Sequence, residues 1–340
     1  DAMRLDESSI REAAVKRTGL HDFGDPAYEE GFSRVVASAD RDANLHPLGR
    51  FMTRGIIANF LAQRLWLVEE RKREPDLFAR PLHPPLVITG PARSGTTFLH
   101  NLLAADEAHR ALPMWQLMRP FPAWEGDGED PRRTEMKRSM RFRGPLLPDI
   151  DAKHYMEADS LEECILPLGL TFKSLIFPTL IPVAGYMEWY LAQEDHRQKY
   201  REYRWLLNVF QAEQPALRLT LKAPDHLLGL EGLVAAMPEA MIVQTHRDPV
   251  PCVSSACSLI YTYHQAMTTE LDGRRMSVVA LRLYEPCFRR TRAFRDAHPG
   301  RVYDVAFEEL VTDPLGVVLG IYDHFNLPWS PVTEATLRAS

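Results

Sequence analysis

From residue 86 onward, short apolar runs alternate with segments whose apolar residues recur at helical spacing. The runs have the length and composition of buried parallel strands. We expect these strands at residues 86–89, 217–221, 241–245 and 302–306. Helices are expected at residues 225–237, 250–267 and 278–297. Strands that alternate with helices predict an α/β fold built on a central parallel sheet.

The first 80 residues show helical spacing instead of apolar runs. Apolar residues between 48 and 74 recur every third or fourth position and stop before Pro75, which predicts a long helix. Ser8 or Ser9 is expected to cap an earlier helix that ends at Gly19. The pattern therefore predicts a helical extension over residues 1–80, packed on an α/β domain over residues 81–340 as one structural unit.

Residues 110–215 are rich in Pro, Met and Trp and contain little strand signal. They predict a mostly helical insertion that supplies substrate or lid elements over one end of the sheet. The apolar stretch 165–183 contains Lys173 and three prolines, so its pieces are too short to cross a membrane. We expect a buried or lid-forming helix pair there and no stable membrane insertion. Met and aromatic side chains in the insertion would suit a hydrophobic alcohol or phenol if they line a cavity.

Composition narrows the function classes. The chain has 340 residues, of which 45% are hydrophobic, and a formal net charge of −6, which gives no overall attraction to nucleic acid. The arginine-rich stretches 132–143 and 289–295 are interpreted as solvated helix faces. Four cysteines without CxxC spacing indicate free thiols rather than a metal site, and the absence of a leader-like segment predicts a cytoplasmic location. A homodimer is compatible with these features.

The segment Gly90–Leu99, which reads GPARSGTTFL, follows the first expected strand and opens a helix. Successive backbone N–H groups in such a turn, together with the positive end of the helix, bind an anion. Ser94, Thr96 and Thr97 add hydroxyl donors. A nucleotide-hydrolysing P-loop has Lys where this chain has Thr96, and here the positive charge comes from Arg93. The segment is therefore a phosphate-binding loop without the usual lysine, and no acidic residue is placed to hold Mg²⁺.

This loop resembles that of the bacterial sulfotransferases, which reads Pro-x-Arg-Ser-Gly-Thr-Thr. The resemblance implies a P-loop-like three-layer fold and a donor, 3′-phosphoadenosine 5′-phosphosulfate (PAPS), that leaves as adenosine 3′,5′-bisphosphate (PAP). A second motif of the family, an Arg followed eight residues later by a Ser, binds the 3′-phosphate and matches Arg247 and Ser255. The loop residues implied to hold the 5′-phosphosulfate are Arg93, Ser94, Gly95, Thr96, Thr97 and Phe98.

The resemblance also points to catalytic groups. Lys222, in Lys222-Ala223-Pro224, resembles the Lys-x-Pro turn of protein-tyrosine sulfotransferases and would face the bridging oxygen of the donor together with Arg93. Many relatives carry a Glu where this chain has Gln116, which cannot take a proton. His154 and Glu163 are the remaining candidates for the general base, and no metal is required because fixed cations meet the charge.

The sequence thus predicts a sulfotransferase that moves a sulfuryl group from PAPS to a hydroxyl of a hydrophobic small molecule. Two alternatives stay open at this stage. One is a P-loop nucleotide or metabolite kinase, which Thr96 in place of Lys disfavours. The other is a catalytically inactive nucleotide-binding homologue, in which Gln116 marks lost activity.

Overall fold

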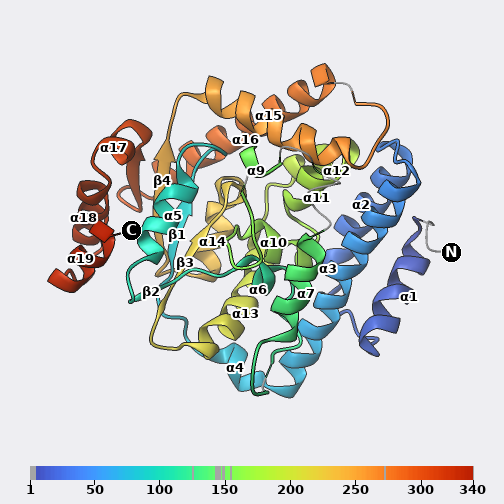
Figure 1. Ribbon diagram of the computed structural model, residues 1–340, viewed down its shortest axis with the longest axis horizontal. Helices are drawn as coiled ribbons and strands as arrows, with labels where there is room; N and C mark the ends of the chain where they lie inside the picture. Colours follow the sequence, from blue (N-terminus) through green and yellow to red (C-terminus); the bar gives the residue numbers. More distant parts are fainter. Residues whose placement is uncertain are drawn as a thin grey trace.

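The computed structural model describes residues 5–339 apart from 125, 142–146, 148–149, 154 and 272. A five-stranded sheet lies at its centre, with all strands parallel and the order β2-β3-β1-β4-β5 (Figure 1). The strands are β1 (Leu86–Thr89), β2 (His109–Arg110), β3 (Arg218–Lys222), β4 (Met241–His246) and β5 (Val302–Ala306). The expected parallel sheet is confirmed, and each expected strand lies within one residue of its predicted bounds. Strand β2 was not predicted because two residues show no periodicity.

Helices make up most of the remaining described chain. The three short 3₁₀ turns are η1 (Pro26–Tyr28), η2 (Gly169–Thr171) and η3 (Pro224–Leu228). The α-helices are α1 (Glu7–Thr18), α2 (Glu29–Arg41), α3 (Pro47–Arg73), α4 (Pro75–Ala79), α5 (Thr96–Ala104), α6 (Met114–Met118), α7 (Pro131–Met140), α9 (Ile150–Lys153), α10 (Ile165–Leu168), α11 (Ile176–Leu180), α12 (Ala184–Ala192), α13 (Arg197–Glu213), α14 (Leu230–Ala236), α15 (Pro249–Gln265), α16 (Gly273–Ala297), α17 (Phe307–Thr312), α18 (Pro314–His324) and α19 (Pro331–Ala339).

The three central strands β1, β3 and β4 are buried on both faces, which explains their apolar runs. Side chains alternate along β1, so Leu86 and Ile88 join a core with α5, α17, α18 and α19, whereas Val87 faces the larger core on the other side. Figure 1 shows the carboxyl-terminal helices on one flank of the sheet and the helices of the amino-terminal part and the insertion on the other. This arrangement is the predicted three-layer α/β fold.

The amino-terminal helices share a core with the sheet. Phe32 of α2, Phe60 of α3 and Val87 of β1 all belong to one buried cluster. We therefore propose that residues 1–80 and 81–340 form one structural unit. The expected cap of the first helix was wrong in detail: Asp6, rather than Ser8 or Ser9, caps α1, because its carboxylate accepts from the backbone N–H of Ser9 at 3.0 Å.

The stretch 165–183 forms the expected broken helix pair, with η2 between α10 and α11. Within the described ranges, every helix is too short or too polar to serve as a transmembrane span. In the sheet, β1 lies between β3 and β4. The strand order therefore reverses at β1: β2 and β3 lie on one side of it, and β4 and β5 lie on the other. Open α/β sheets form their ligand crevice at such a point, outside the carboxyl ends of the strands. The loop after β1 therefore lies where a ligand is expected.

Candidate active site at the carboxyl edge of the sheet

The loop between β1 and α5 is held in its shape by contacts to β4. The Ser94 hydroxyl lies 2.6 Å from the hydroxyl of Thr245 and 2.6 Å from the Pro91 carbonyl oxygen, to which it donates. Gly90 is required next to them, because a Cβ there would lie 2.2 Å from the Thr245 hydroxyl oxygen. Ser94, predicted as a donor to phosphate, is thus buried with its hydroxyl engaged inside the loop.

The first turn of α5 presents its backbone N–H groups to the space in front of the loop. The first hydrogen bond of the helix joins the N–H of Leu99 to the carbonyl of Gly95, so the N–H groups of residues 96–98 precede the helical ladder. Such groups bind anions. Thr96 and Thr97 line the adjoining cavity, whereas the exposed side chain of Phe98 does not.

Gly95 starts this turn with a φ of +90°, a conformation that costs other residues free energy. A Cβ at this position would also lie 3.0 Å from the Phe307 ring. We expect Gly95→Ala to lower the free energy of unfolding by about 1–2 kcal/mol, the usual cost of left-handed backbone for an L-residue. Urea unfolding measures this change. The matched Gly55→Ala, in open space on α3, should instead be neutral or stabilising, and equal destabilisation by both would contradict the prediction.

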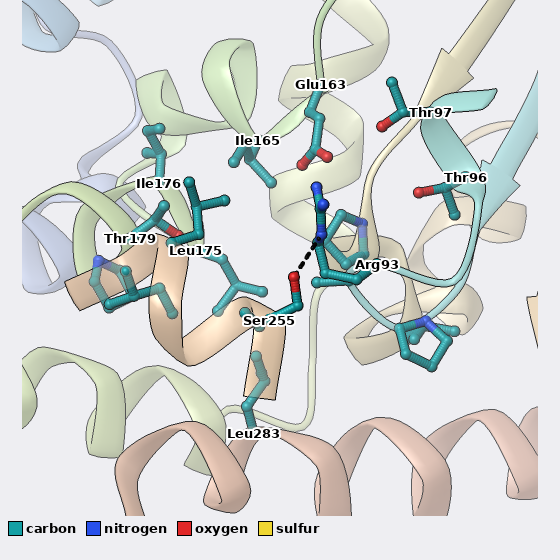
Figure 2. A pocket seen from close by; sticks show the side chains of 18 of the residues that line it. Arg93, Thr96, Thr97, Glu163, Ile165, Leu175, Ile176, Thr179, Ser255 and Leu283 are labelled. Atoms are coloured by element: carbon teal, nitrogen blue, oxygen red, sulfur yellow. Dashed lines mark hydrogen bonds between the residues drawn. The ribbon is translucent and has the colours of Figure 1, made fainter. Parts of the chain in front are cut away.

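The two arginines of the predicted donor motifs come together. The Arg93 Nε donates to the Ser255 hydroxyl at 2.9 Å, drawn as the dashed line in Figure 2. Arg247 donates to the Arg93 carbonyl oxygen at 2.8 Å, and its guanidinium lies 3.9 Å from the centre of the Phe307 ring. Arg93 itself has a φ of +71°, rare for a residue with a side chain. Residues separated by more than 150 positions thus form one cationic cluster.

Lys222 and Glu163 form an ion pair beside this cluster. The Lys222 Nζ lies 2.8 Å from a Glu163 carboxylate oxygen and 3.3 Å from the Thr97 hydroxyl oxygen. The lysine side chain is fully buried, whereas the glutamate is 20% exposed and lines the cavity. Figure 2 shows the Glu163 carboxylate on the same side of the cavity as Arg93 and Thr97. Glu163 is therefore open to a ligand, whereas Lys222 does not line the cavity and contacts its wall through Glu163 and Thr97.

Beneath Lys222 lies the buried His100 of α5. Burial, together with the nearby Lys222 charge, lowers the pKa of His100 to about 3. Its Nε2 lies 3.1 Å from the Thr220 carbonyl oxygen. At neutral pH the imidazole is uncharged, so it adds no cation to the Lys222 region.

Two other predicted positions fall elsewhere. The Gln116 amide donates to Glu213 at 2.6 Å, and its oxygen accepts from Arg110 at 3.2 Å. Gln116 does not line the cavity, so the departure from the family Glu does not alter the wall of this site. His154 lies outside the described residues.

The cavity in front of the loop has a volume of about 740 Å³. Its cationic end is formed by Arg93, Arg247 and Ser255, and most of its other walls are apolar. Figure 2 shows Leu175, Ile176 and Thr179 across the cavity from Thr96 and Thr97. Sequence reasoning identified the cationic end but missed further walls from α15 and α16, because ordinary amphipathic helices carry no local signal of a cavity. These missed walls are Ile260, Tyr263, Leu283, Tyr284, Cys287 and Phe288.

Among the described residues, no three His, Cys, Asp or Glu side chains gather in a way that could hold a metal ion. In the part of the chain that the structure describes, the cations that line the cavity are Arg93 and Arg247, next to a phosphate-type loop on an α/β scaffold. This fold and loop define the class of P-loop-like proteins. Residues 84–331 match the sulfotransferase family, so the chain belongs to that family. The resemblance to sulfotransferases that the sequence indicated is thus confirmed at the level of the family.

Relatives of this chain come from mycobacteria. It is 26% identical over 254 residues to the omega-hydroxy-beta-dihydromenaquinone-9 sulfotransferases Stf3 of Mycobacterium bovis and Mycobacterium tuberculosis. The match covers 72% of this chain and 63% of the relative, so the chain spans less than two thirds of the length of these proteins.

Solved sulfotransferase structures resemble it over nearly the whole chain. Sulfotransferase STF1 from Mycobacterium tuberculosis H37Rv is 30% identical with a TM-score of 0.87, and the match covers 98% of this chain and 92% of STF1. Sulfotransferase STF9 from Mycobacterium avium is 26% identical with a TM-score of 0.89, covering 99% and 87% respectively. The helical extension and the α/β part thus occur together in related proteins.

Proposed function

We propose that this protein transfers a sulfuryl group from PAPS to the hydroxyl of an apolar alcohol or phenol. The observation that carries the proposal is a single cavity with two chemically different ends. Arg93, Arg247 and the first turn of α5 lie at one end, apolar walls lie at the other, and Glu163 lies along the same cavity. Family membership supports sulfuryl transfer as the reaction.

The cationic end fits the phosphate groups of the donor. Arginine forms forked, charge-assisted hydrogen bonds with phosphate, and the N–H groups of residues 96–98 add fixed donors. We assign the 5′-phosphosulfate to the loop with Arg93, and the 3′-phosphate to Arg247 and Ser255. The existing hydrogen bond between Arg93 and Ser255 brings the two subsites together at 2.9 Å.

The transfer itself requires one bond to form and one to break. The acceptor oxygen attacks the sulfur atom and forms a new S–O bond, while the S–O bond to the 5′-phosphate breaks and its electron pair stays on the leaving PAP. Glu163 takes the acceptor proton, because its carboxylate is exposed to the cavity. Lys222 and Arg93 stabilise the negative charge that develops on the leaving oxygen.

The acceptor end is apolar, with Met114, Met156, Leu175 and Ile176 among its walls. Such walls favour a hydrophobic acceptor and exclude water that would compete for the sulfuryl group. The curated mycobacterial relatives are named for a hydroxylated menaquinone, which is also an apolar alcohol. An alcohol or phenol with an apolar body is therefore the acceptor class that we propose.

Calorimetric titration with PAP, and separately with ATP and Mg²⁺, tests the donor site. We expect the wild-type protein to prefer PAP, and Arg247→Ala to weaken PAP binding by about 10- to 100-fold, the usual value of a charge-assisted hydrogen bond. Arg338→Ala removes an exposed arginine of α19 that pairs with Glu334, and should leave binding unchanged. Preference for ATP with Mg²⁺ would favour the kinase alternative, and PAP binding without any turnover would favour the inactive homologue.

A further inference from the structure

A second cavity, of about 630 Å³, adjoins the one that holds the candidate active site. Four side chains line both cavities, one each from α11, α12, α15 and α16. These shared residues, which we call the neck, are Pro178, Met187, Ile260 and Leu283. All four side chains are apolar, so an apolar chain that passes between the cavities would meet no charged or hydrogen-bonding side chain there. The two cavities are thus neighbours with an apolar boundary between them.

The inner walls of the second cavity are mostly apolar and uncharged. Val183, Ala184 and Leu271 line it. His264 lies in the same wall, and burial lowers its pKa to about 4, so the ring is neutral near pH 7. Its Nε2 lies 3.0 Å from the carbonyl oxygen of Pro178 in the neck. A charged or strongly polar group would therefore lose its hydration here without a matching partner.

The far side of the second cavity is polar and reaches solvent. Asp42, Asn44, Thr269 and Glu270 line it and are exposed. The Asn44 amide donates to Glu270 at 3.1 Å, which joins the loop after α2 to the loop after α15. The path from the neck is therefore open at its outer end and sets no fixed limit on the length of a chain that follows it.

We propose that the acceptor is a long-chain alcohol whose hydroxyl lies at Glu163 while its chain crosses the neck and fills the second cavity. This inference rests on the proposed function and narrows its acceptor class. A short alcohol or a single phenol ring would leave the second cavity filled with water. Each methylene that enters an apolar space leaves water, which strengthens binding by roughly three- to fourfold.

Equilibrium binding of a series of straight-chain primary alcohols, from butan-1-ol to tetradecan-1-ol, tests this path in the presence of saturating PAP. We expect the affinity of the wild-type protein to rise with each added methylene over most of the series. Ala184→Trp places an indole in the second cavity from the start of α12 and should make the rise stop at a shorter chain length. Binding of butan-1-ol should not change.

Two further variants distinguish the effect of filling the second cavity from the effect of a damaged fold. Ala192→Trp adds the same side chain to an exposed position on the same helix, outside both cavities, and should keep the wild-type chain-length profile. Cys257→Phe fills the second cavity from α15 and should shorten the profile as Ala184→Trp does, which keeps the test valid if one variant does not fold.

Each outcome of these binding measurements supports or overturns the long-chain acceptor site. A wild-type profile that levels off at the same chain length as the two filled variants, or failure of every alcohol to bind, overturns the inference. Sulfuryl transfer from PAPS to the best-binding alcohol is measured separately. Chain-length-dependent binding without transfer would reject the proposed function but retain the long-chain site, whereas transfer with an unchanged profile in both filled variants would reject the long-chain site alone.

Discussion

Replacing Glu163 with glutamine is expected to lower kcat by about 10²- to 10⁴-fold, the usual contribution of a general base. Glutamine keeps the length of the side chain, and its amide oxygen can still accept the hydrogen bond that Lys222 makes at 2.8 Å. It cannot take the proton of the acceptor hydroxyl. Because the Glu163 carboxylate is held by Lys222 and not by the arginines of the donor end, the affinity for PAP should change by only a few fold.

The measurement is the pH profile of kcat, together with PAP affinity. Glu163→Gln should stay far below the wild-type rate over the whole profile, while its affinity for PAP stays within a few fold. Glu157→Gln is the matched control, because Glu157 is exposed and lies outside the cavity. Its carboxylate accepts a hydrogen bond from the Tyr155 hydroxyl at 2.5 Å. The kcat of Glu157→Gln should equal that of the wild-type protein.

His154 is the competing candidate, and the same assay separates the two residues. If Glu163→Gln retains wild-type kcat while His154→Ala loses activity with PAP binding intact, the histidine is the base and the assignment of Glu163 fails. Loss of activity in both variants to a similar extent would show that Glu163 is not the sole base. The ion pair with Lys222 favours Glu163, since it fixes one carboxylate oxygen and leaves the group accessible.

The centre of the sheet was predictable because its strands are buried on both faces. Residues 86–89 and 241–245 are buried throughout, and each segment begins with three consecutive apolar residues. Strand β2 has only two residues, and its pairing with β3 depends on the rest of the sheet. The Asp6 cap was missed because several capping residues occur in succession and only geometry selects one.

The donor end of the site was predictable for a related reason. Arg247 directly follows β4 and Arg93 lies in the loop after β1, and parallel strands bring their carboxyl ends to one edge. The acceptor end was predictable only in part. Met114 and Met156 of the insertion line it, as expected of Met side chains there, but the walls from α15 and α16 were missed, because the sequence shows that these helices are apolar on one side and not that they leave a space beside them.

A buried ion pair behind the site was also missed. Asp225 follows Lys222 by three residues and lies in η3. In the structure Asp225 and Lys199 are both fully buried, with 3.0 Å between Oδ1 and Nζ. Asp225 also accepts from the Tyr190 hydroxyl at 2.5 Å and from the Leu175 backbone N–H at 3.1 Å. Leu175 lines the active-site cavity, so this network connects the Lys222 turn to an acceptor wall.

Substitution of Asp225 by alanine is expected to lower the free energy of unfolding by about 3–5 kcal/mol, because it leaves the charge of Lys199 buried without its partner. Burial raises the pKa of the Asp225 carboxyl, but the Lys199 charge and the hydrogen bonds lower it overall, while burial lowers the pKa of Lys199. Urea unfolding at pH 7 measures the loss.

A double variant shows whether Asp225→Ala destabilises the protein by leaving the Lys199 charge without its partner or by removing side-chain volume and hydrogen bonds. Lys199→Met with Asp225→Leu removes both charges and keeps the volume apolar, and should recover most of the stability that Asp225→Ala loses. Glu188→Ala, which breaks an exposed ion pair between α12 and Arg282, should cost less than about 1 kcal/mol. A double variant as unstable as Asp225→Ala would show instead that the hydrogen bonds to Tyr190 and Leu175, rather than charge neutralisation, hold the Lys222 turn against the acceptor wall.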